Sequence, residues 1–276
     1  MDLRLLSSVA AQTGLSLENG RLTEAIKEEV RARERHNREL ELGREVQERL
    51  FPQEYAAIPG LDYAGACRPA LGVGGDYYDF IPMSNGGLGI AIGDISGKGI
   101  PAALLMATLR AFLRGQAIDQ KTDLREVLVN LNRLVFESSA QNRYATFFLG
   151  VFNSASQVLN YVNAGHNPPM LIRAGGEVER LEVGGTVVGL MQAGTWVQGQ
   201  VKLQAGDFLV AFTDGISEAM NDTDDEWGEE RLIEATQAIR GTPAKAILDH
   251  IMHSADGFVA GAPQYDDMTL IVARVE

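Results

Sequence analysis

The stretch ATFFLGVFNSASQVLNYVNAGHNPPMLIRAGG at residues 145–176 indicates the class of fold. It contains two apolar runs, 145–153 and 158–165, separated by a short polar segment, and a third run that begins near residue 168. Short runs rich in β-branched and aromatic residues are typical of strands, and a short connection between two such runs favours a hairpin. The stretch therefore predicts the middle of an antiparallel sheet.

Similar patterns on both sides extend this sheet into an α+β domain. Further strands are expected at 88–96, 207–215 and 268–276, and helices at 101–114, 124–138, 229–239 and 243–253. The strands neighbour one another along the chain and do not alternate regularly with helices. This order favours two packed antiparallel sheets with helices outside over a βαβ series.

The N-terminal part of the chain has a different character. It contains no proline, and Leu22, Ile26 and Val30 recur at the spacing of one helical face. The segment 31–39, RARERHNRE, has almost no apolar residue. A lone helix of this kind buries little and gains stability by pairing. Two interpretations stay open: a solvated connector helix, or a helix that transmits signals and forms a homodimer through residues 15–50.

Three segments follow from these patterns. Residues 1–20 form a terminal helix, 21–52 a helical linker or coiled coil, and 53–276 the folded domain. Gly14 and Gly20 are expected to weaken or interrupt the helical pattern, because glycine is a poor helix former.

Composition excludes several classes of protein. The chain has 276 residues, with 24 Lys+Arg against 37 Asp+Glu, which gives a formal charge of −13. Such acidity disfavours binding to nucleic acid or an anionic membrane and suits a protein that holds cations. The single cysteine, Cys67, excludes an intrachain disulfide framework. No apolar run reaches the ~18 residues that span a bilayer, and no signal peptide is evident, so the cytoplasm is the expected compartment.

Acidic residues at strand ends or beside glycine point to a metal site. Asp76 lies in LGVGGDYYDF, Asp94 ends GIAIGD, Asp214 ends LVAFTD, and Asp266 and Asp267 precede the last strand. Each alone fits a turn or a helix cap. Together, carboxylates that meet at one rim repel unless cations lie between them, and Mg²⁺ or Mn²⁺ prefers such oxygen ligands. Two such ions can activate water for attack at phosphorus.

Five ordered blocks then carry a family resemblance. They are GVGGDYYDF at 72–80, GDISGKGIPAALLMA at 93–107, NAGHNPPML at 163–171, FTDGISEA at 212–219 and YDDMTL at 265–270. In this order they resemble the metal-dependent (PPM) serine/threonine phosphatases, specifically the bacterial SpoIIE-type branch, which is similar to protein phosphatase 2C. The resemblance covers about residues 46–276. It implies an α-β-β-α sandwich with two metal ions at one rim, and leaves a third ion open.

The resemblance also implies roles for the acids. Asp94 corresponds to the carboxylate that bridges the two metals, and Ile95 would offer its backbone carbonyl. Asp214 and Asp266 correspond to ligands of the more buried ion, and Asp76 to the outer acid, bound directly or through water. The catalytic set is thus Asp76, Asp94 and Asp214.

The neighbour of Asp266 has two possible roles. Asp267 is implied as an alternate metal ligand or as a hydrogen-bond acceptor that supports the ligands. Because Asp266 matches the family ligand and Asp267 does not, Asp266→Ala is expected to cost more activity than Asp267→Ala.

Several other residues carry open alternatives. Eukaryotic relatives place a phosphate-binding arginine a few residues before the first aspartate, where this chain has LGVGG at 71–75. Phosphate contacts would then come from the metals, from Lys98 or from backbone near Gly97 and Gly99; a solvent-facing Lys98 is the favoured interpretation. For His166, hydrogen-bonded support of a turn is favoured over general-acid catalysis.

The residues around the motifs are expected to be structural. Asp79 is read as support for the site or as a surface residue, and Tyr77, Tyr78 and Phe80 as packing at a sheet edge. Cys67 is read as a small buried residue and not as a nucleophile. For the acidic segment 222–231, a solvated loop is favoured over a flap beside the active site.

The resemblance finally implies partners. Relatives act on phosphoserine or phosphothreonine in STAS-type anti-sigma-factor antagonists, and they use the helix matching 44–53 to couple sensing to activity. The segment 5–22 resembles the closing helix of a GAF sensory domain. The main alternative function is a regulatory binding module with little turnover. A nucleotide cyclase, suggested by GGDYYDF, is disfavoured because Tyr77 stands where that signature has an acid.

Overall fold

The structure, a computed structural model, describes residues 3–83, 86–116, 118–119, 121–138 and 143–276. Within its first helix, side chains are described from Gln12 onward, apart from that of Leu15. The chain forms two units, Met1–Glu45 and Val46–Glu276.

The first unit consists of the long helix α1 (Leu3–Glu48), whose last turn belongs to the second unit. The helix continues through Gly14 and Gly20, so the expected interruption is wrong. A glycine costs a helix interior only about 1 kcal/mol, so two of them do not stop a long helix. Nowhere in the described residues is there a helix long and apolar enough to cross a membrane.

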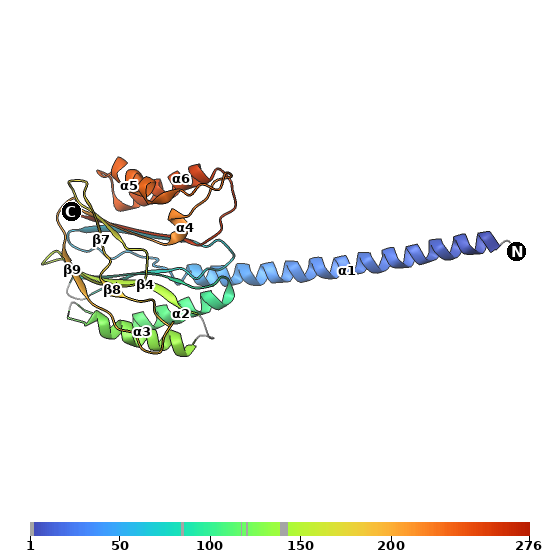
Figure 1. Ribbon diagram of the computed structural model, residues 1–276, viewed down its shortest axis with the longest axis horizontal. Coiled ribbons are helices and arrows are strands. Elements are labelled where there is room, and N and C mark those ends of the chain that lie inside the picture. The colour runs from blue at the N-terminus through green and yellow to red at the C-terminus, as the bar shows by residue number, and fades with distance from the viewer. Residues whose placement is uncertain (1–2, 84–85, 117, 120, 139–142) are drawn as a thin grey trace. The chain divides into compact units, whose positions relative to one another are not determined.

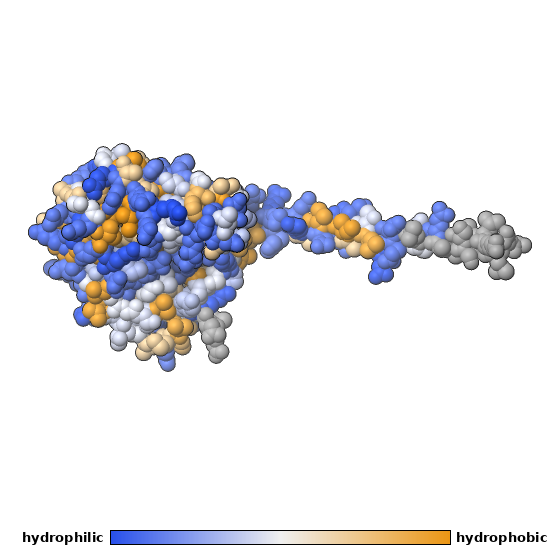
Figure 2. Space-filling model, turned by 45° about the horizontal axis from the view of Figure 1, so that its top comes forward, coloured by the Kyte–Doolittle hydropathy of each residue, from blue (hydrophilic) through white to orange (hydrophobic). Residues whose placement is uncertain are grey.

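Apolar side chains remain exposed along α1. Leu22, Ile26 and Val30 have exposed fractions of 53%, 60% and 48%. Leu17, Leu42 and Val46 of the same helix are exposed too. Figure 2 shows an apolar patch on a helix surface that is otherwise mostly hydrophilic. The described part of the chain gives this patch nothing to pack against.

The second unit is an α+β sandwich of two sheets. Its strands are β1 (Leu61–Arg68), β2 (Tyr77–Pro82), β3 (Leu88–Ile95), β4 (Ala145–Asn153), β5 (Val158–Ala164), β6 (Met170–Ile172), β7 (Val178–Arg180), β8 (Gly184–Gly185), β9 (Gly199–Lys202), β10 (Phe208–Phe212) and β11 (Met268–Val275). Its helices are α2 (Ile100–Gly115), α3 (Leu124–Ser138), α4 (Asp214–Ser217), α5 (Gly228–Ala238) and α6 (Ala244–Val259).

The strands form a five-stranded sheet of order β1-β11-β10-β6-β7 and a six-stranded sheet of order β2-β3-β4-β5-β8, with β9 on β5. Pairing is antiparallel, as expected, except for a two-residue parallel contact between β5 and β8. Helices α5 and α6 cover the outside of the first sheet, and α2 and α3 cover the outside of the second (Figure 1). The predicted sandwich, with helices on both outer faces, is confirmed.

Because side chains alternate along a strand, β10 contributes to two hydrophobic cores. In β10, Phe208, Val210 and Phe212 face the layer of α5 and α6, whereas Leu209 and Ala211 face the other sheet. Side chains of a strand point alternately to its two faces, so a continuous apolar run marks a strand that is buried on both sides.

The second unit begins before the expected boundary at residue 53. Gln47 and Phe51 are buried within it, and the Phe51 ring stacks on Tyr78 with 5.2 Å between centroids. The end of α1 and the residues just after it therefore contact the domain core, Gln47 from the last turn and Phe51 from the segment that follows.

Candidate metal centre and active site

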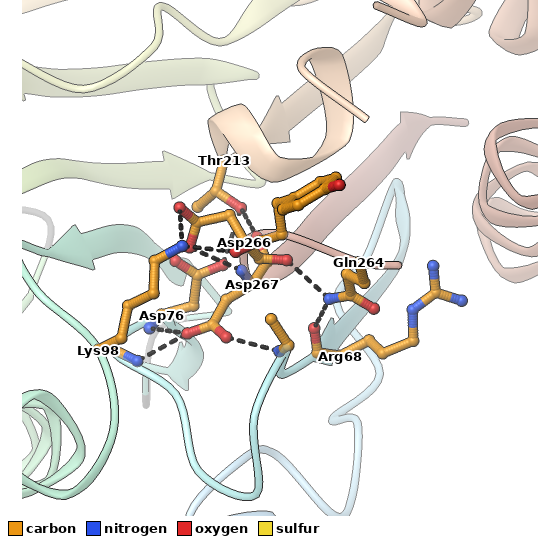
Figure 3. Close-up of polar contacts among 10 residues, drawn as sticks. Arg68, Asp76, Lys98, Thr213, Gln264, Asp266 and Asp267 are labelled. Carbon is orange, nitrogen blue, oxygen red and sulfur yellow. Dashed lines mark hydrogen bonds and ion pairs between the residues drawn. The ribbon is translucent and has the colours of Figure 1, made fainter. Parts of the chain in front are cut away.

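The predicted acids come together at one end of the two sheets. Asp76 immediately precedes β2, and Asp94 lies near the end of β3, both in the six-stranded sheet. Asp214 begins α4 directly after β10, and Asp266 lies just before β11, both in the other sheet. The sandwich thus brings carboxylates from both sheets to a common rim (Figure 3).

Asp76 is the most deeply buried of these acids, with an exposed fraction of 2%. Its Oδ2 accepts hydrogen bonds from the hydroxyls of Thr213 at 2.8 Å and Thr269 at 2.5 Å. Burial, and then the charge of Asp94, raises the pKa of Asp76 well above its usual range. The two hydrogen bonds hold the carboxylate in place, but its ionised form remains unfavourable in this buried position.

The neighbouring acids are perturbed in the same direction. Burial, followed by the charges of Asp214, Asp266 and Asp267, raises the pKa of Asp94 to about 7. Burial and Asp266 also raise the pKa of Asp214. Such shifts reflect burial first and repulsion among the carboxylates second, and both disfavour the ionised form.

Lys98 supplies a partial substitute for such a cation. Its ammonium lies 2.9 Å from Oδ2 of Asp266 and donates to the carbonyl of Tyr265 (Figure 3). Lys98 is exposed, as the favoured solvent-facing interpretation expects, but its ammonium also pairs with a proposed metal ligand. The side chain is 48% exposed, yet it turns toward the acids because they provide the nearest negative charge.

Asp267 anchors the loop that leads to Asp76. Its Oδ1 accepts from the backbone N–H of Ala70 at 2.8 Å, and its Oδ2 accepts from that of Gly75 at 2.7 Å. A Cβ on Gly74 would lie 2.2 Å from Oδ2, so the loop packs against the carboxylate with no room for a side chain. These bonds give Asp267 the geometry of a supporting acceptor.

Glycines let the backbone close around the rim. A Cβ on Gly75 would lie 2.8 Å from the carbonyl oxygen of Ile95, the predicted backbone ligand. A Cβ on Gly215 would lie 2.1 Å from the carbonyl oxygen of Asp267. The glycines of two motifs are thus needed for close approach of the segments that carry the acids.

The donors suit a hard divalent cation. The groups at the rim are carboxylate and carbonyl oxygens, and one ammonium already lies against them. Among the described residues, no three carboxylate, imidazole or thiol side chains lie close enough together to hold an ion by themselves. Mg²⁺ is commonly held by one or two carboxylates and keeps several waters, so this arrangement still fits.

His166 has the features of a structural residue. Its Nδ1 lies 2.9 Å from the hydroxyl of Thr146, and its backbone N–H and C=O both pair with the side chain of Asn163. Burial lowers the pKa of His166 to about 4. These contacts support the turn interpretation, because the ring is enclosed and neutral.

Tyr77, Tyr78 and Phe80 are buried, as expected, whereas Cys67, expected to be buried, is partly exposed. Asp79 has an exposed fraction of 0% and forms a bidentate ion pair with Arg114, so a surface position for it is wrong. Tyr77 stacks near Phe147, and its hydroxyl donates to Asp79. Burial raises the pKa of the Cys67 thiol well above its usual value, which agrees with an inert cysteine.

The acidic segment 222–231 begins as an exposed turn. The side chain of Asn221 organises this turn by accepting from the backbone N–H groups of Thr223 and Asp225. Residues 222–226 are exposed, and α5 starts at Gly228. The favoured solvated-loop interpretation is confirmed for the first half of the segment, while the second half is helical.

The structure adds residues that the sequence did not suggest. Thr213 directly follows the apolar strand β10, and Thr269 interrupts the apolar run of β11 two residues after Asp267, which is a usable signal. The amide of Gln47 donates to the Gly74 carbonyl at 2.7 Å and accepts from the Gly74 N–H at 3.0 Å. Gln47 thereby ties the end of α1 to the Asp76 loop, and nothing local distinguishes it from other helix glutamines.

A second unpredicted residue lies near the loop after Asp94. The guanidinium of Arg143 would lie 3.6 Å from a Cβ on Gly97. Its Nη1 is buried and has no hydrogen-bond partner among the described residues. Arg143 therefore brings a guanidinium, one nitrogen of which has no hydrogen-bond partner among the described residues, to the loop around Gly97.

The two-sheet sandwich and its rim of aspartates define a domain of the protein phosphatase 2C type. A solved structure of the SiaA-PP2C domain of Pseudomonas aeruginosa superimposes with a TM-score of 0.78 and 19% identity, over 89% of this chain and 99% of that one. The PP2C phosphatase domain of SpoIIE from Bacillus subtilis gives a TM-score of 0.62 and 21% identity, over 80% and 64% of the two chains.

Sequence comparison identifies the family. The profile of Stage II sporulation protein E (SpoIIE) matches residues 84–276, and the chain belongs to this family. Protein IcfG of Synechocystis is 30% identical over 84% of this chain and 41% of its own length. Phosphoserine phosphatase RsbU of Bacillus subtilis is 28% identical over 99% of this chain and 79% of its own. The chain thus spans less than half of IcfG and most of RsbU.

Proposed function

We propose that this chain is a metal-dependent protein serine/threonine phosphatase of the cytoplasm that acts on a phosphorylated STAS-type regulatory protein. The observation that carries the proposal is the meeting of Asp76, Asp94, Asp214 and Asp266 at one rim, with raised pKa values for the first three. Family membership supports it, since RsbU and RsbP of Bacillus subtilis are both named phosphoserine phosphatases.

The acids of the rim would hold two Mg²⁺ or Mn²⁺ ions. Asp94, Asp214, Asp266 and Asp76 are the proposed side-chain ligands, and Ile95 offers its carbonyl. When bound, such ions supply Lewis-acid chemistry that activates water and neutralises the phosphoryl group. A related fold supports a metal requirement, because RsbX has been solved in complex with magnesium.

The chain's own residues position these groups. The hydroxyls of Thr213 and Thr269 orient the Asp76 carboxylate by donating to the same oxygen. Asp267 fixes the loop before Asp76 through two backbone N–H groups. Arg143 is the proposed contact for phosphate oxygens, because its Nη1 has no hydrogen-bond partner among the described residues and a guanidinium suits an oxyanion.

The test is release of phosphate from a phosphoserine-bearing STAS protein. We expect turnover with Mn²⁺ or Mg²⁺ and none in a chelator. Binding of the phosphoprotein without release of phosphate, under any metal, would instead favour the regulatory binding module. Equal turnover with and without chelator would contradict the metal requirement.

We also propose that the chain forms a homodimer through residues 15–50. The exposed patch of Leu22, Ile26 and Val30 on α1 supports this proposal, since an apolar stripe at helical spacing gains stability by pairing with a second helix. The charged residues around it would steer the pairing and add little, because exposed ion pairs are worth under about 1 kcal/mol each.

Removal of residues 1–42 should give a monomer with lower activity that still binds metal. The shortened chain keeps Gln47 and its two bonds to Gly74, so the rim stays intact. Light scattering and matched phosphatase assays on both chains provide the measurement. A full-length chain that is monomeric at tens of micromolar, or a shortened chain with unchanged turnover, would reduce α1 to a passive connector.

A further inference from the structure

A pocket of about 610 Å³ adjoins the acidic rim. One wall is the segment after α4, with Glu218, Ala219 and Met220, and another is the segment between α6 and β11. Gly215 and Asp266 line the pocket and also belong to the rim. The pocket is therefore continuous with the place where the phosphoryl group would be attacked, and no part of the proposed reaction uses it.

The pocket is mainly apolar. Its apolar lining consists of Ala219, Met220, Val259, Ala262, Pro263 and Met268. Arg68 also lines it, but its guanidinium is held by Asp256 in a bidentate ion pair at 2.6 and 3.0 Å. This pair neutralises two of the charged groups and leaves a surface that favours an aliphatic side chain.

The remaining charge is negative and lies toward the rim. Glu218 is exposed, and the charged groups near it are the carboxylates of Asp214, Glu226 and Asp266. Cations bound at the rim would neutralise Asp214 and Asp266 but would leave Glu218 and Glu226. A basic group on an incoming segment would complement them.

The amide of Gln264 fixes the pocket relative to the rim. It donates to the backbone carbonyl of Arg68 at 2.8 Å and to that of Asp266 at 2.7 Å (Figure 3). One side chain thus joins a pocket wall to the loop of a proposed metal ligand. A segment seated in the pocket would be held in register with the reacting centre.

We propose that this pocket is a specificity subsite for the protein substrate. The pocket binds an aliphatic side chain of the substrate segment that carries the phosphoserine, and the same segment presents a basic residue to Glu218. The inference rests on the proposed phosphatase function. An extended chain advances about 3.3 Å per residue, so a pocket that shares Asp266 with the rim lies within reach of a residue one to three positions from the phosphoserine.

The test uses synthetic phosphoserine peptides with Mn²⁺. In one set, a single leucine in an alanine and serine background moves from the third residue before the phosphoserine to the third residue after it. We expect one position to raise kcat/KM about tenfold, the usual scale for a small hydrophobic pocket. A second set of peptides keeps the leucine at its best position and places a single lysine at each remaining position in turn. We expect one lysine position to raise kcat/KM by a smaller, several-fold factor.

Two variants connect these preferences to the pocket. Ala262→Phe fills it and should abolish the leucine preference, whereas Ala155→Phe, in the exposed β4–β5 turn, should keep it. Glu218→Gln should abolish the lysine preference, whereas Glu182→Gln, beside β7 at the opposite edge of the sheet, should keep it. For each enzyme the readout is the ratio of peptide to para-nitrophenyl phosphate hydrolysis, which corrects for changes in folding or metal loading.

The outcomes separate the two proposals. A leucine preference that survives Ala262→Phe, or peptides hydrolysed equally at every leucine position, would overturn the subsite while leaving the phosphatase function intact. Absence of metal-dependent hydrolysis of both the peptides and para-nitrophenyl phosphate would overturn the phosphatase function and the subsite with it.

Discussion

Asp94→Asn should lower phosphatase turnover by about a thousandfold or more, and Asp214→Asn should do the same. Both carboxylates are proposed ligands of the ions that activate water, a contribution worth several kcal/mol, and each 1.36 kcal/mol corresponds to tenfold in rate. Phosphate release with Mn²⁺ provides the measurement. Asp249→Asn is the matched control, because the side chain of that aspartate is half-exposed on α6 and pairs with Lys245 four residues away.

The same variants should change stability in the opposite direction when metal is removed. Burial and neighbouring carboxylates raise the pKa of Asp94 to about 7, so its ionisation opposes folding at neutral pH. Replacement by a neutral amide removes that cost, so Asp94→Asn should melt at a higher temperature than the wild type in chelator. Mn²⁺ should raise the Tm of the wild type, because a ligand of the folded state stabilises it, and should raise that of the variant much less.

Full activity of either variant, or of the wild type in chelator, would contradict the two-metal proposal. A lower Tm for Asp94→Asn in chelator would show instead that the carboxylate makes a favourable contact in the metal-free protein. Because activity and melting are expected to move in opposite directions, a variant that simply fails to fold cannot imitate the predicted result.

The central strands could be predicted because their sequences are apolar on both faces. The expected strand at 145–153 matches β4 at both ends, and the run at 268–276 matches β11 to within one residue. By contrast, β1 has the sequence LDYAGACR, whose small residues carry little strand signal. Its place in the sheet comes from eight pairs with β11, a contact between the two ends of the domain that no local pattern reveals.

The third expected strand shows a different limit of sequence patterns. The run at 168–176 predicted a strand, yet β6 covers only Met170–Ile172. Its partner β10 pairs with it at three positions, after which the chain turns. The length of a strand depends on its partner as much as on its own residues, so the pattern placed β6 correctly and overestimated its extent.

The acids of the site could be found from sequence because each follows an apolar run or stands beside glycine. Their supports could not, because these are contacts between distant segments. Thr213 and Thr269 meet only because β10 and β11 pair, and both hydroxyls then reach Asp76. The orientation of the Lys98 side chain likewise depends on the position of Asp266, which is distant from it in the sequence.

Substitutions at Asp266 and Asp267 should separate a proposed metal ligand from a structural anchor. Asp266→Ala removes a carboxylate that pairs with the exposed Lys98 ammonium and accepts from the backbone N–H of Asp267, so the Tm in chelator should change less than it does in Asp267→Ala. The Mn²⁺ concentration that gives half-maximal activity should rise steeply, and activity at high Mn²⁺ should remain far below that of the wild type.

Asp267→Ala should instead act through stability. It leaves the buried backbone N–H of Gly75 and the partly buried N–H of Ala70 without their acceptor, at a cost of about 1–3 kcal/mol for the buried group and less for the other. For a domain of this size, each kcal/mol corresponds to about 2–4 °C, so the Tm in chelator should fall by several degrees. Below that Tm, with saturating Mn²⁺, Asp267→Ala should retain more activity than Asp266→Ala. If Asp267→Ala showed the larger shift in Mn²⁺ dependence and an unchanged Tm, Asp267 would be the ligand and Asp266 its support.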